Sequence, residues 1–172
     1  MSEGCFATIQ GESKPATRLL SFRPEVLTRV LGAVTNHERS RTLGHTAAVS
    51  VDRVMAWAWK PARLHRCAER LAAGERAPAV HLSRYWLHGE AWYTVSDGHH
   101  RTIAARQAGL RRIRAKIGGE SWCEPERCWL DTTSGRLWRA VQPGGQVLSL
   151  VMDGIEAELA EALLAVGVNR LR

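Results

Sequence analysis

Residues 97–101, Asp-Gly-His-His-Arg, combine a glycine with residue types that suit phosphate oxygens. Residues 92–95 before them are β-branched and aromatic, which predicts a strand, and residues 99–108 are rich in Ala and Arg, which predicts a helix. Gly98 therefore lies in a tight turn just before a helix, where unpaired backbone N–H groups carry partial positive charge. Arg101 adds a planar set of hydrogen-bond donors. The stretch predicts a phosphate-binding turn.

Each side chain of this turn also has a structural interpretation. His99 and His100 could contact phosphate, or both could only hydrogen-bond neighbouring groups of the fold. Arg101 could bind phosphate, or it could form an ion pair with Asp97. Asp97 could cap the helix, or it could hold a Mg²⁺ ion together with the phosphates, because Mg²⁺ prefers hard oxygen ligands. Thr102 could add a hydroxyl group to the phosphate site or lie on the helix surface.

The elements predicted around this turn must position it. Residues 36–46 are polar and predict a loop, and residues 47–57 predict a strand followed by a turn. Trp57 and Trp59 would point to the same side of an extended backbone, where packing is favoured over base stacking. The other predicted elements are helices at 24–34 and 61–73, strands at 79–86 and 92–96 joined through Gly89, strands at 113–117 and 137–141, and an amphipathic helix in the second half of 146–168.

The turn also resembles a known signature. Residues 97–101, followed by Ala-Ala-Arg at 104–106 and Ala-Gly-Leu at 108–110, resemble the signature box of the ParB/sulfiredoxin superfamily. The resemblance covers roughly residues 49–117, with residues 49–54 similar to the family's first strand. It implies an α+β fold with a small mixed sheet and packed helices, and an exit from the family domain at Gly118 and Gly119.

The resemblance implies a nucleotide site as well. Sulfiredoxins place a nucleophilic Cys where this chain has His99, so sulfiredoxin activity is not expected. The rest of the box, which the family uses against ATP phosphates, is kept. The implied ATP-binding residues are Gly98, His99, His100, Arg101, Thr102, Lys60 and Arg63, the last two by position only. The implied catalytic residues are Asp97, His99, His100 and Arg101, with Asp97 as the Mg²⁺ ligand.

Three functions are compatible with this box. The first is an ATPase and DNA-cleaving enzyme, similar to the compact plasmid-borne ParB-like nucleases that act on transferred DNA. The second is an ATP- or ADP-dependent kinase of the same fold, for which Glu75 and Glu90 are the nearest candidate bases in the sequence. The third is a non-catalytic DNA-binding partition or regulatory protein, which is disfavoured because the short chain after residue 117 is Trp-rich and then forms one helix.

The composition fits a partner with phosphate groups. The net charge is +7, and all but three of the 24 basic residues are arginines, which favour bidentate phosphate contacts. The alternative explanation for the excess of Arg is a genome rich in G and C, whose codon usage favours Arg over Lys on an ordinary solvated surface. DNA would be held through its backbone and largely without regard to sequence.

The chain is expected to be cytoplasmic and to have no membrane span, because it has no long apolar run and no signal-peptide pattern at its start. Its four cysteines form no Cys-x-x-Cys pair and are expected to be reduced, and a zinc site at Cys123 and Cys128 is not expected. We expect an N-terminal arm at 1–17, the ParB/sulfiredoxin-like domain with its N-terminal helix at 18–119, and a Trp-rich extension with a C-terminal helix packed on the same domain at 120–172. That last helix could cover the sheet or form the seam of a homodimer.

Overall fold

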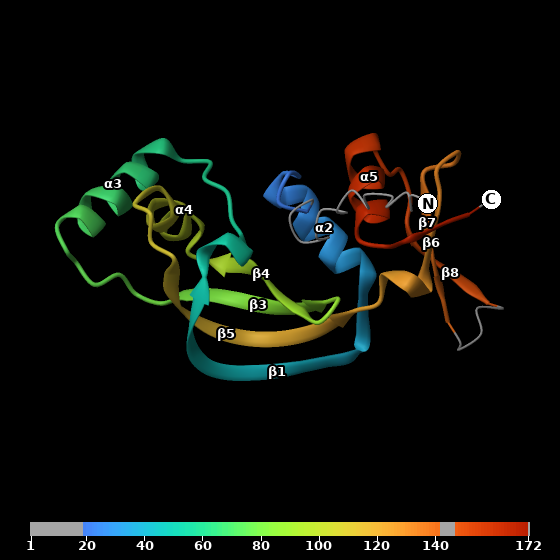
Figure 1. Ribbon diagram of the computed structural model, residues 1–172, viewed down its shortest axis with the longest axis horizontal. Coiled ribbons are helices and arrows are strands. Elements are labelled where there is room, and N and C mark those ends of the chain that lie inside the picture. The colour runs from blue at the N-terminus through green and yellow to red at the C-terminus, as the bar shows by residue number, and fades with distance from the viewer. Residues whose placement is uncertain (1–18, 142–146, 172) are drawn as a thin grey trace, which may run out of the picture.

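The computed structural model describes residues 19–141 and 147–171, in which helices and two mixed β-sheets confirm the predicted α+β class (Figure 1). The N-terminal arm predicted for residues 1–17 lies outside these ranges. No helix in the described part of the chain is long and apolar enough to cross a membrane. The first sheet lies in the middle of the elongated molecule, and the second sheet lies at one end (Figure 1).

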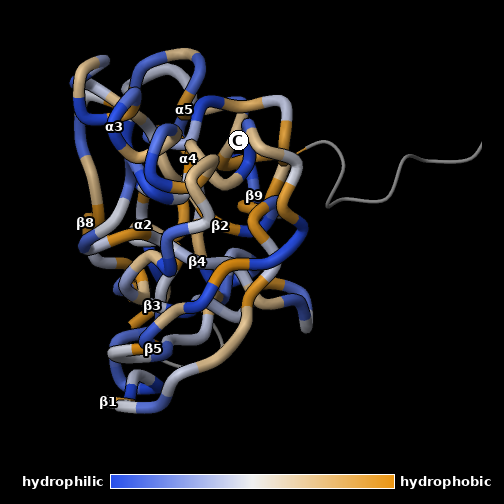
Figure 2. Tube along the Cα trace, turned by 90° about the vertical axis from the view of Figure 1, so that its left-hand side faces the viewer, coloured by the Kyte–Doolittle hydropathy of each residue, from blue (hydrophilic) through white to orange (hydrophobic). Residues whose placement is uncertain are grey.

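The first sheet has the strand order β1-β5-β3-β4-β2. Strands β3 and β4 form the predicted hairpin, whose two-residue turn has positive φ at His88 (51°) and Gly89 (76°). β5 runs parallel to β3 and antiparallel to β1, and Figure 2 shows β4, β3, β5 and β1 following one another away from the helices. The bounds are β1 Thr35–Ser50, β2 Val54–Met55, β3 Val80–Leu87, β4 Glu90–Asp97 and β5 Arg112–Cys123.

The second sheet has the strand order β8-β7-β6-β9, and its inner face contributes to the larger hydrophobic core. The predicted helix α2, Pro24–Val34, is confirmed, and Pro24 at its first position suits the fixed φ of proline. Its buried face packs against α5, Ala157–Ala165, over the strands of this sheet. The bounds of the strands are β6 Cys128–Asp131, β7 Arg136–Ala140, β8 Leu148–Met152 and β9 Asn169–Arg170.

Two further helices lie at the end of the first sheet that is remote from the second sheet (Figure 1). Helix α3, Pro61–Ala72, packs on α4, His99–Gln107, and none of the α3 side chains is fully buried. The Nη2 atom of Arg106 on α4 donates hydrogen bonds to the carbonyls of Val51 and Val54, each at 2.8 Å. These bonds fix α4 against the short 3₁₀ turn Val51–Arg53.

The predicted loop at residues 36–46 is wrong, because these residues belong to β1. β1 is an edge strand of the first sheet, and most of its residues from 36 to 46 are exposed, so the polar–apolar alternation that marks a half-buried strand is missing. Its pairing with β5 is irregular between Asn36 and Arg41 and again between Thr42 and His45. Such irregularities protect a free edge from pairing with another chain.

Two boundaries implied by the family resemblance also differ. Residues 49–54 do not form one strand, because β1 ends at Ser50 and a 3₁₀ turn separates it from β2. The chain does not leave the sheet at Gly118 and Gly119, because β5 continues to Cys123 and keeps its pairing with both β1 and β3. The two glycines instead lie where the register of both pairings shifts.

Candidate phosphate-binding site

The turn between β4 and α4 is built on Gly98. Its φ is +107°, a conformation that side-chain-bearing residues rarely adopt. A Cβ atom at this position would lie 2.6 Å from Cγ1 of Val80 and 2.9 Å from its Cβ, so the Val80 side chain on β3 also leaves no room for a side chain here. The predicted order of strand, glycine turn and helix is confirmed, with β4 ending at Asp97 and α4 beginning at His99.

An open hollow of about 710 Å³ lies between the first turn of α4 and one face of α3; we call it the α4 hollow. The α4 side provides Gly98 and the first helical residues, whose backbone N–H groups have no partner within the helix. The α3 side provides arginines at helical spacing. The lining residues are Trp59, Arg63, Arg66, Cys67, Arg70, Pro78, Ser96, Asp97, Gly98, His99, His100 and Arg101.

The arginines on the α3 side differ in how they are neutralised. Arg70 donates to Glu75 at 2.6 Å, so its charge is compensated. Arg63 and Arg66 form no ion pair with any residue that the structure describes. Asp97 is the one carboxylate among the described residues that line the hollow. The hollow therefore has an excess of positive charge facing the start of a helix, which favours a bound anion.

Arg101 is held by the fold itself. Its Nη2 atom donates to Oδ2 of Asp97 at 2.7 Å, and its Nη1 atom donates to the carbonyls of Pro78 and Ala79 at 2.9 and 3.1 Å. The ion pair that the sequence left as an alternative is therefore present. These bonds tie α4 to the start of β3. Because Arg101 is held in this way, Arg63 and Arg66 are the guanidinium groups of the hollow that are more available to a ligand.

His99 and His100 lie in an aromatic and partly buried environment. The ring centroid of His99 lies 4.2 Å from that of Trp57 and 5.3 Å from that of Trp59. The Nδ1 atom of His99 accepts a hydrogen bond from the backbone N–H of Trp57 at 3.4 Å. His100 is 8% exposed, and its Nε2 atom accepts the N–H of Lys60 at 3.3 Å. Because Lys60 precedes the first residue of α3, this bond joins the starts of the two helices.

Both imidazoles favour the neutral form. Burial, followed by the neighbouring His100, lowers the pKa of His99 below its ordinary value of 6.5. Burial, followed by the charges of Arg63 and Lys60, lowers the pKa of His100. A neutral imidazole can still donate one N–H to a phosphate oxygen, although each ring already accepts a backbone N–H.

This shift predicts a loss of stability in mild acid. Because the pKa of His100 is lower in the folded chain than in the unfolded one, the unfolded state binds more protons, and the stabilisation is present above about 6.5 and lost as the pH falls below it. We expect the urea midpoint to fall between about pH 7.5 and pH 5.5, and His100→Gln, which keeps a hydrogen-bond acceptor, to reduce this fall. An unchanged pH dependence in the variant would contradict the assignment.

Some predicted site residues do not face the hollow. Thr102 is fully buried, and its hydroxyl donates to the Gly98 carbonyl at 3.1 Å. Lys60 contributes its backbone N–H to His100 but does not line the hollow. The two candidate bases are also outside it, since Glu75 pairs with Arg70 and Glu90 lies at the far end of β4, where Arg53 donates to it at 2.6 Å.

Among the described residues, no group of three or more His, Cys, Asp or Glu side chains is arranged so that it could hold a metal ion. Asp97 supplies a single carboxylate, 70% exposed and paired with Arg101. Such a donor set does not fit a metal ion bound by protein groups alone. It fits Mg²⁺ that is held mainly by nucleotide phosphates and water, which is the usual mode for this ion.

Sequence reasoning did not include Arg66, Trp59 and Ser96 in the site. Arg63, Arg66 and Arg70 recur at spacings of three and four on α3, which is the signal that places them on one helix face. Trp59 is 53% exposed, and its ring lies 4.8 Å from that of His100, so it covers one side of the hollow. The spacing of Trp57 and Trp59 predicted that both rings point to the same side of the chain, but it did not indicate that Trp59 would contact His100.

No protein-family model matches this chain, and no curated protein matches it either.

Proposed function

We propose that the α4 hollow binds the phosphates of ATP, and that the protein is a hydrolase that turns over ATP and cleaves DNA. The observation that carries this proposal is the excess of positive charge in the hollow, where two arginines that pair with no described carboxylate face the first turn of α4. The resemblance of residues 97–101 to the ParB/sulfiredoxin box supports ATP as the ligand.

Each part of the hollow has a role in this proposal. The backbone N–H groups of the first α4 turn and the side chains of Arg63 and Arg66 would hold the phosphates. Arg101 acts as a positioning residue, because it is bound to Asp97 and to the carbonyls before β3. The exposed ring of Trp59 offers an apolar surface beside the phosphates. Mg²⁺ bound with the phosphates would supply an activated water for hydrolysis.

The geometry gives less support to a kinase. Phosphoryl transfer to a hydroxyl group needs a positioned carboxylate base, as in protein kinases. The one carboxylate among the described residues of the hollow, Asp97, is engaged by Arg101, and Glu75 and Glu90 lie outside it. Water, which needs no such base when a metal ion lowers its pKa, is the better nucleophile for this site.

Loss of Arg63 and Arg66 is expected to weaken ATP binding. The double variant Arg63→Ala/Arg66→Ala should lose affinity for Mg²⁺-ATP by on the order of 100-fold in titration calorimetry, because each charge-assisted hydrogen bond contributes about 1.5 kcal/mol or more. The matched control is Arg29→Ala/Arg136→Ala, which removes the same charge from arginines that are paired with Glu156 and Asp153. Equal losses in both variants would show that the hollow is not the site.

Turnover assays separate the three functions. With Mg²⁺, the purified protein is expected to release phosphate from ATP and to nick DNA, and both activities should fall in the Arg63→Ala/Arg66→Ala variant. Absence of both activities would refute the hydrolase. Transfer of phosphate to serine or to a protein would indicate a kinase, and binding of unchanged DNA would indicate a regulator.

A further inference from the structure

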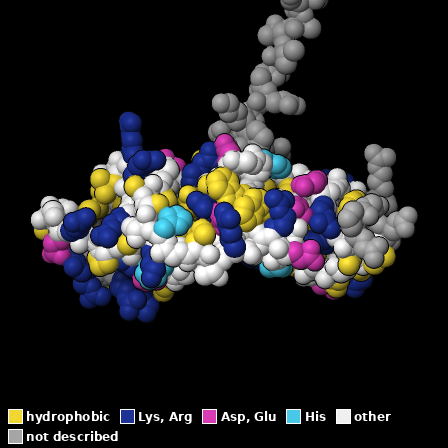
Figure 3. Space-filling view, turned by 90° about the horizontal axis from the view of Figure 1, so that it is seen from below, with side chains coloured by type: hydrophobic (Ala, Val, Ile, Leu, Met, Phe, Trp, Pro, Cys, Tyr) yellow, Lys and Arg dark blue, Asp and Glu magenta, His cyan; other side chains and the backbone are white. Residues whose placement is uncertain are grey.

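The basic side chains of this protein are distributed unevenly. In the part described, most arginines around the second sheet are matched with carboxylates or carbonyls, as in the pairs Arg23–Glu158, Arg29–Glu156 and Arg136–Asp153, and Arg170 on β9 is the exception. The end with α3 and α4 has eight basic side chains that form neither an ion pair with a described residue nor a hydrogen bond to a carbonyl of one, and Figure 3 shows Lys and Arg side chains crowding there. The eight are Lys60, Arg63, Arg66, Arg76, Arg111, Arg112, Arg114 and Lys116.

Three of these cations form a line on one strand. Arg112, Arg114 and Lys116 alternate along β5 with Ile113, Ala115 and Ile117, which belong to or pack against the hydrophobic core of the first sheet. The three basic side chains are therefore on the opposite face, and all three residues are exposed. We call this surface the basic strand face.

The neighbours on adjacent strands leave these charges uncompensated. Cross-strand partners share a face of a sheet. On β1 the partners are Ser50 for Arg112, Ala48 for Arg114 and Thr46 for Lys116, and on β3 the partner of Lys116 is His81. None of them is a carboxylate. Alternate residues of a strand are about 6.5 Å apart, so the face presents a regular row of cations that an extended polyanion can follow.

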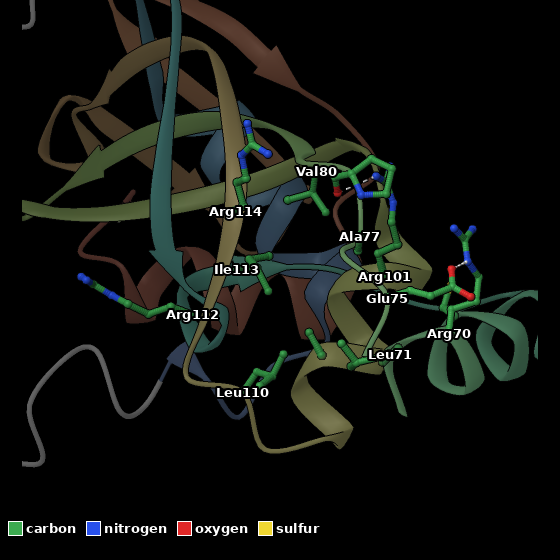
Figure 4. A pocket seen from close by; sticks show the side chains of 14 residues that line it. Arg70, Leu71, Glu75, Ala77, Val80, Arg101, Leu110, Arg112, Ile113 and Arg114 are labelled. Carbon is green, nitrogen blue, oxygen red and sulfur yellow. Dashed lines mark hydrogen bonds and ion pairs between the residues drawn. The ribbon is translucent and has the colours of Figure 1, made fainter. Parts of the chain in front are cut away.

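An apolar pocket opens beside this row, between α3, α4 and the start of β5; we call it the side pocket. Its volume is about 240 Å³, which leaves room for about one nucleobase. Figure 4 shows Leu71, Val80, Leu110 and Ile113 directed toward its interior, while Arg112 and Arg114 extend outward from its rim. The pocket shares Cys67, Arg70, Pro78 and Arg101 with the α4 hollow.

We infer that the basic strand face and the side pocket together bind single-stranded DNA, with backbone phosphates on Arg112, Arg114 and Lys116 and one unstacked base in the side pocket. This inference rests on the proposed function for the choice of DNA as the polyanion. Because the side pocket adjoins the α4 hollow, the bound strand leads to the phosphate-binding site. Duplex DNA is disfavoured, because its bases are stacked and paired and cannot enter an apolar pocket.

Salt dependence of binding tests the basic strand face. The triple variant Arg112→Gln/Arg114→Gln/Lys116→Gln should bind a fluorescein-labelled single-stranded oligonucleotide on the order of 100-fold more weakly near 0.1 M salt, and its salt slope should be smaller by about 2, because each single-strand phosphate contact contributes about 0.7. The matched control, Arg23→Gln/Arg29→Gln/Arg136→Gln, removes the same charge from paired arginines and should change neither value appreciably. Equal losses in the two variants would overturn the inference.

Three ligands test the side pocket and the class of partner. The intact strand should bind at least about tenfold more tightly than the same sequence as a duplex or than a strand with abasic sites, which keeps the phosphates and lacks bases. Equal affinity for all three would overturn the base in the side pocket. Binding to vesicles with anionic lipid that depends on the three β5 cations, without binding to the oligonucleotide, would assign the face to a membrane surface.

The two proposals can fail separately. The Arg63→Ala/Arg66→Ala variant reports on ATP, and the β5 triple variant reports on DNA in the absence of ATP. If oligonucleotide binding does not depend on the β5 cations while ATP binds normally, only this inference is refuted. Strand binding that depends on β5, in a protein that does not bind ATP, would refute the proposed hydrolase.

Discussion

Gly98→Ala is expected to lower the free energy of unfolding by about 3 kcal/mol and to abolish nucleotide binding. Part of this loss is backbone strain, since a left-handed conformation costs a residue with a side chain about 1–2 kcal/mol. The rest is steric, because the new Cβ would lie 2.6 Å from the Val80 side chain on β3, and overpacking of this kind costs about 1–3 kcal/mol. Relief of the backbone strain or of the steric clash would move the first turn of α4, and with it the N–H groups proposed to bind phosphate.

Gly74→Ala is the matched control for Gly98→Ala. Gly74 also has positive φ, +74°, but a Cβ there would meet nothing within 4 Å. It should therefore cost only the backbone strain, about 1 kcal/mol, so thermal unfolding should show a midpoint roughly 3 °C lower for Gly74→Ala and roughly 10 °C lower for Gly98→Ala. Equal shifts, or a Gly98→Ala variant that binds ATP normally, would contradict the role assigned to this turn.

Glu120→Gln is the second large effect. Glu120 is 2% exposed. Its carboxylate accepts hydrogen bonds from Arg84 Nε and Trp86 Nε1, each at 2.9 Å, and forms an ion pair with Arg41. Burial alone would raise its pKa, but the bonds from Trp86, Arg41 and Arg84 outweigh burial and lower the pKa from 4.5 to about 2. Replacing the charged partner of such a buried network is expected to cost about 3 kcal/mol.

The pH dependence of stability separates the network from a packing defect. Because the folded pKa is depressed, the contribution of Glu120 is complete above its ordinary value of 4.5 and is lost as the pH falls toward about 2. Urea unfolding should therefore show a large difference between wild type and Glu120→Gln at pH 7, and a smaller one near pH 3. A difference that does not depend on pH would mean that the carboxylate charge is not what stabilises this end of the sheet.

Glu120→Gln should leave the proposed site intact. Glu120 is paired with Arg84 of β3 and with Arg41 of β1, in the half of β5 that is remote from Arg112. None of the residues around this carboxylate lines the α4 hollow. At a temperature where the variant is still folded, its affinity for ATP should equal that of the wild type, whereas Gly98→Ala should not bind.

The strand, turn and first helical turn of the site could be predicted from the sequence because they depend on neighbours in the chain. β-branched and aromatic residues form β4, Gly98 alone allows the turn, and the Ala-rich stretch forms α4. The same holds for α2, whose bounds follow from Pro24 and an apolar stripe. These local rules do not depend on which distant segment packs against them.

The features that could not be predicted depend on distant partners. β1 is a strand because β5 pairs with it, although its own residues are polar. Arg101 binds carbonyls of the segment before β3, which no spacing within its helix indicates. The buried charge of Glu120 is compensated by arginines that come from β1 and β3, which lie far from it in the sequence. The α3 arginines join the site because α3 packs against α4.

Amide chemical shifts during an ATP titration test the central claim most directly. In ¹H–¹⁵N spectra recorded with Mg²⁺, addition of ATP is expected to produce its largest shifts at the backbone amides of Gly98, His99, His100 and Arg101, with smaller shifts on the Arg63 and Arg66 face of α3. Binding of ATP with those four amides unmoved, and with the largest shifts on another surface, would contradict the account.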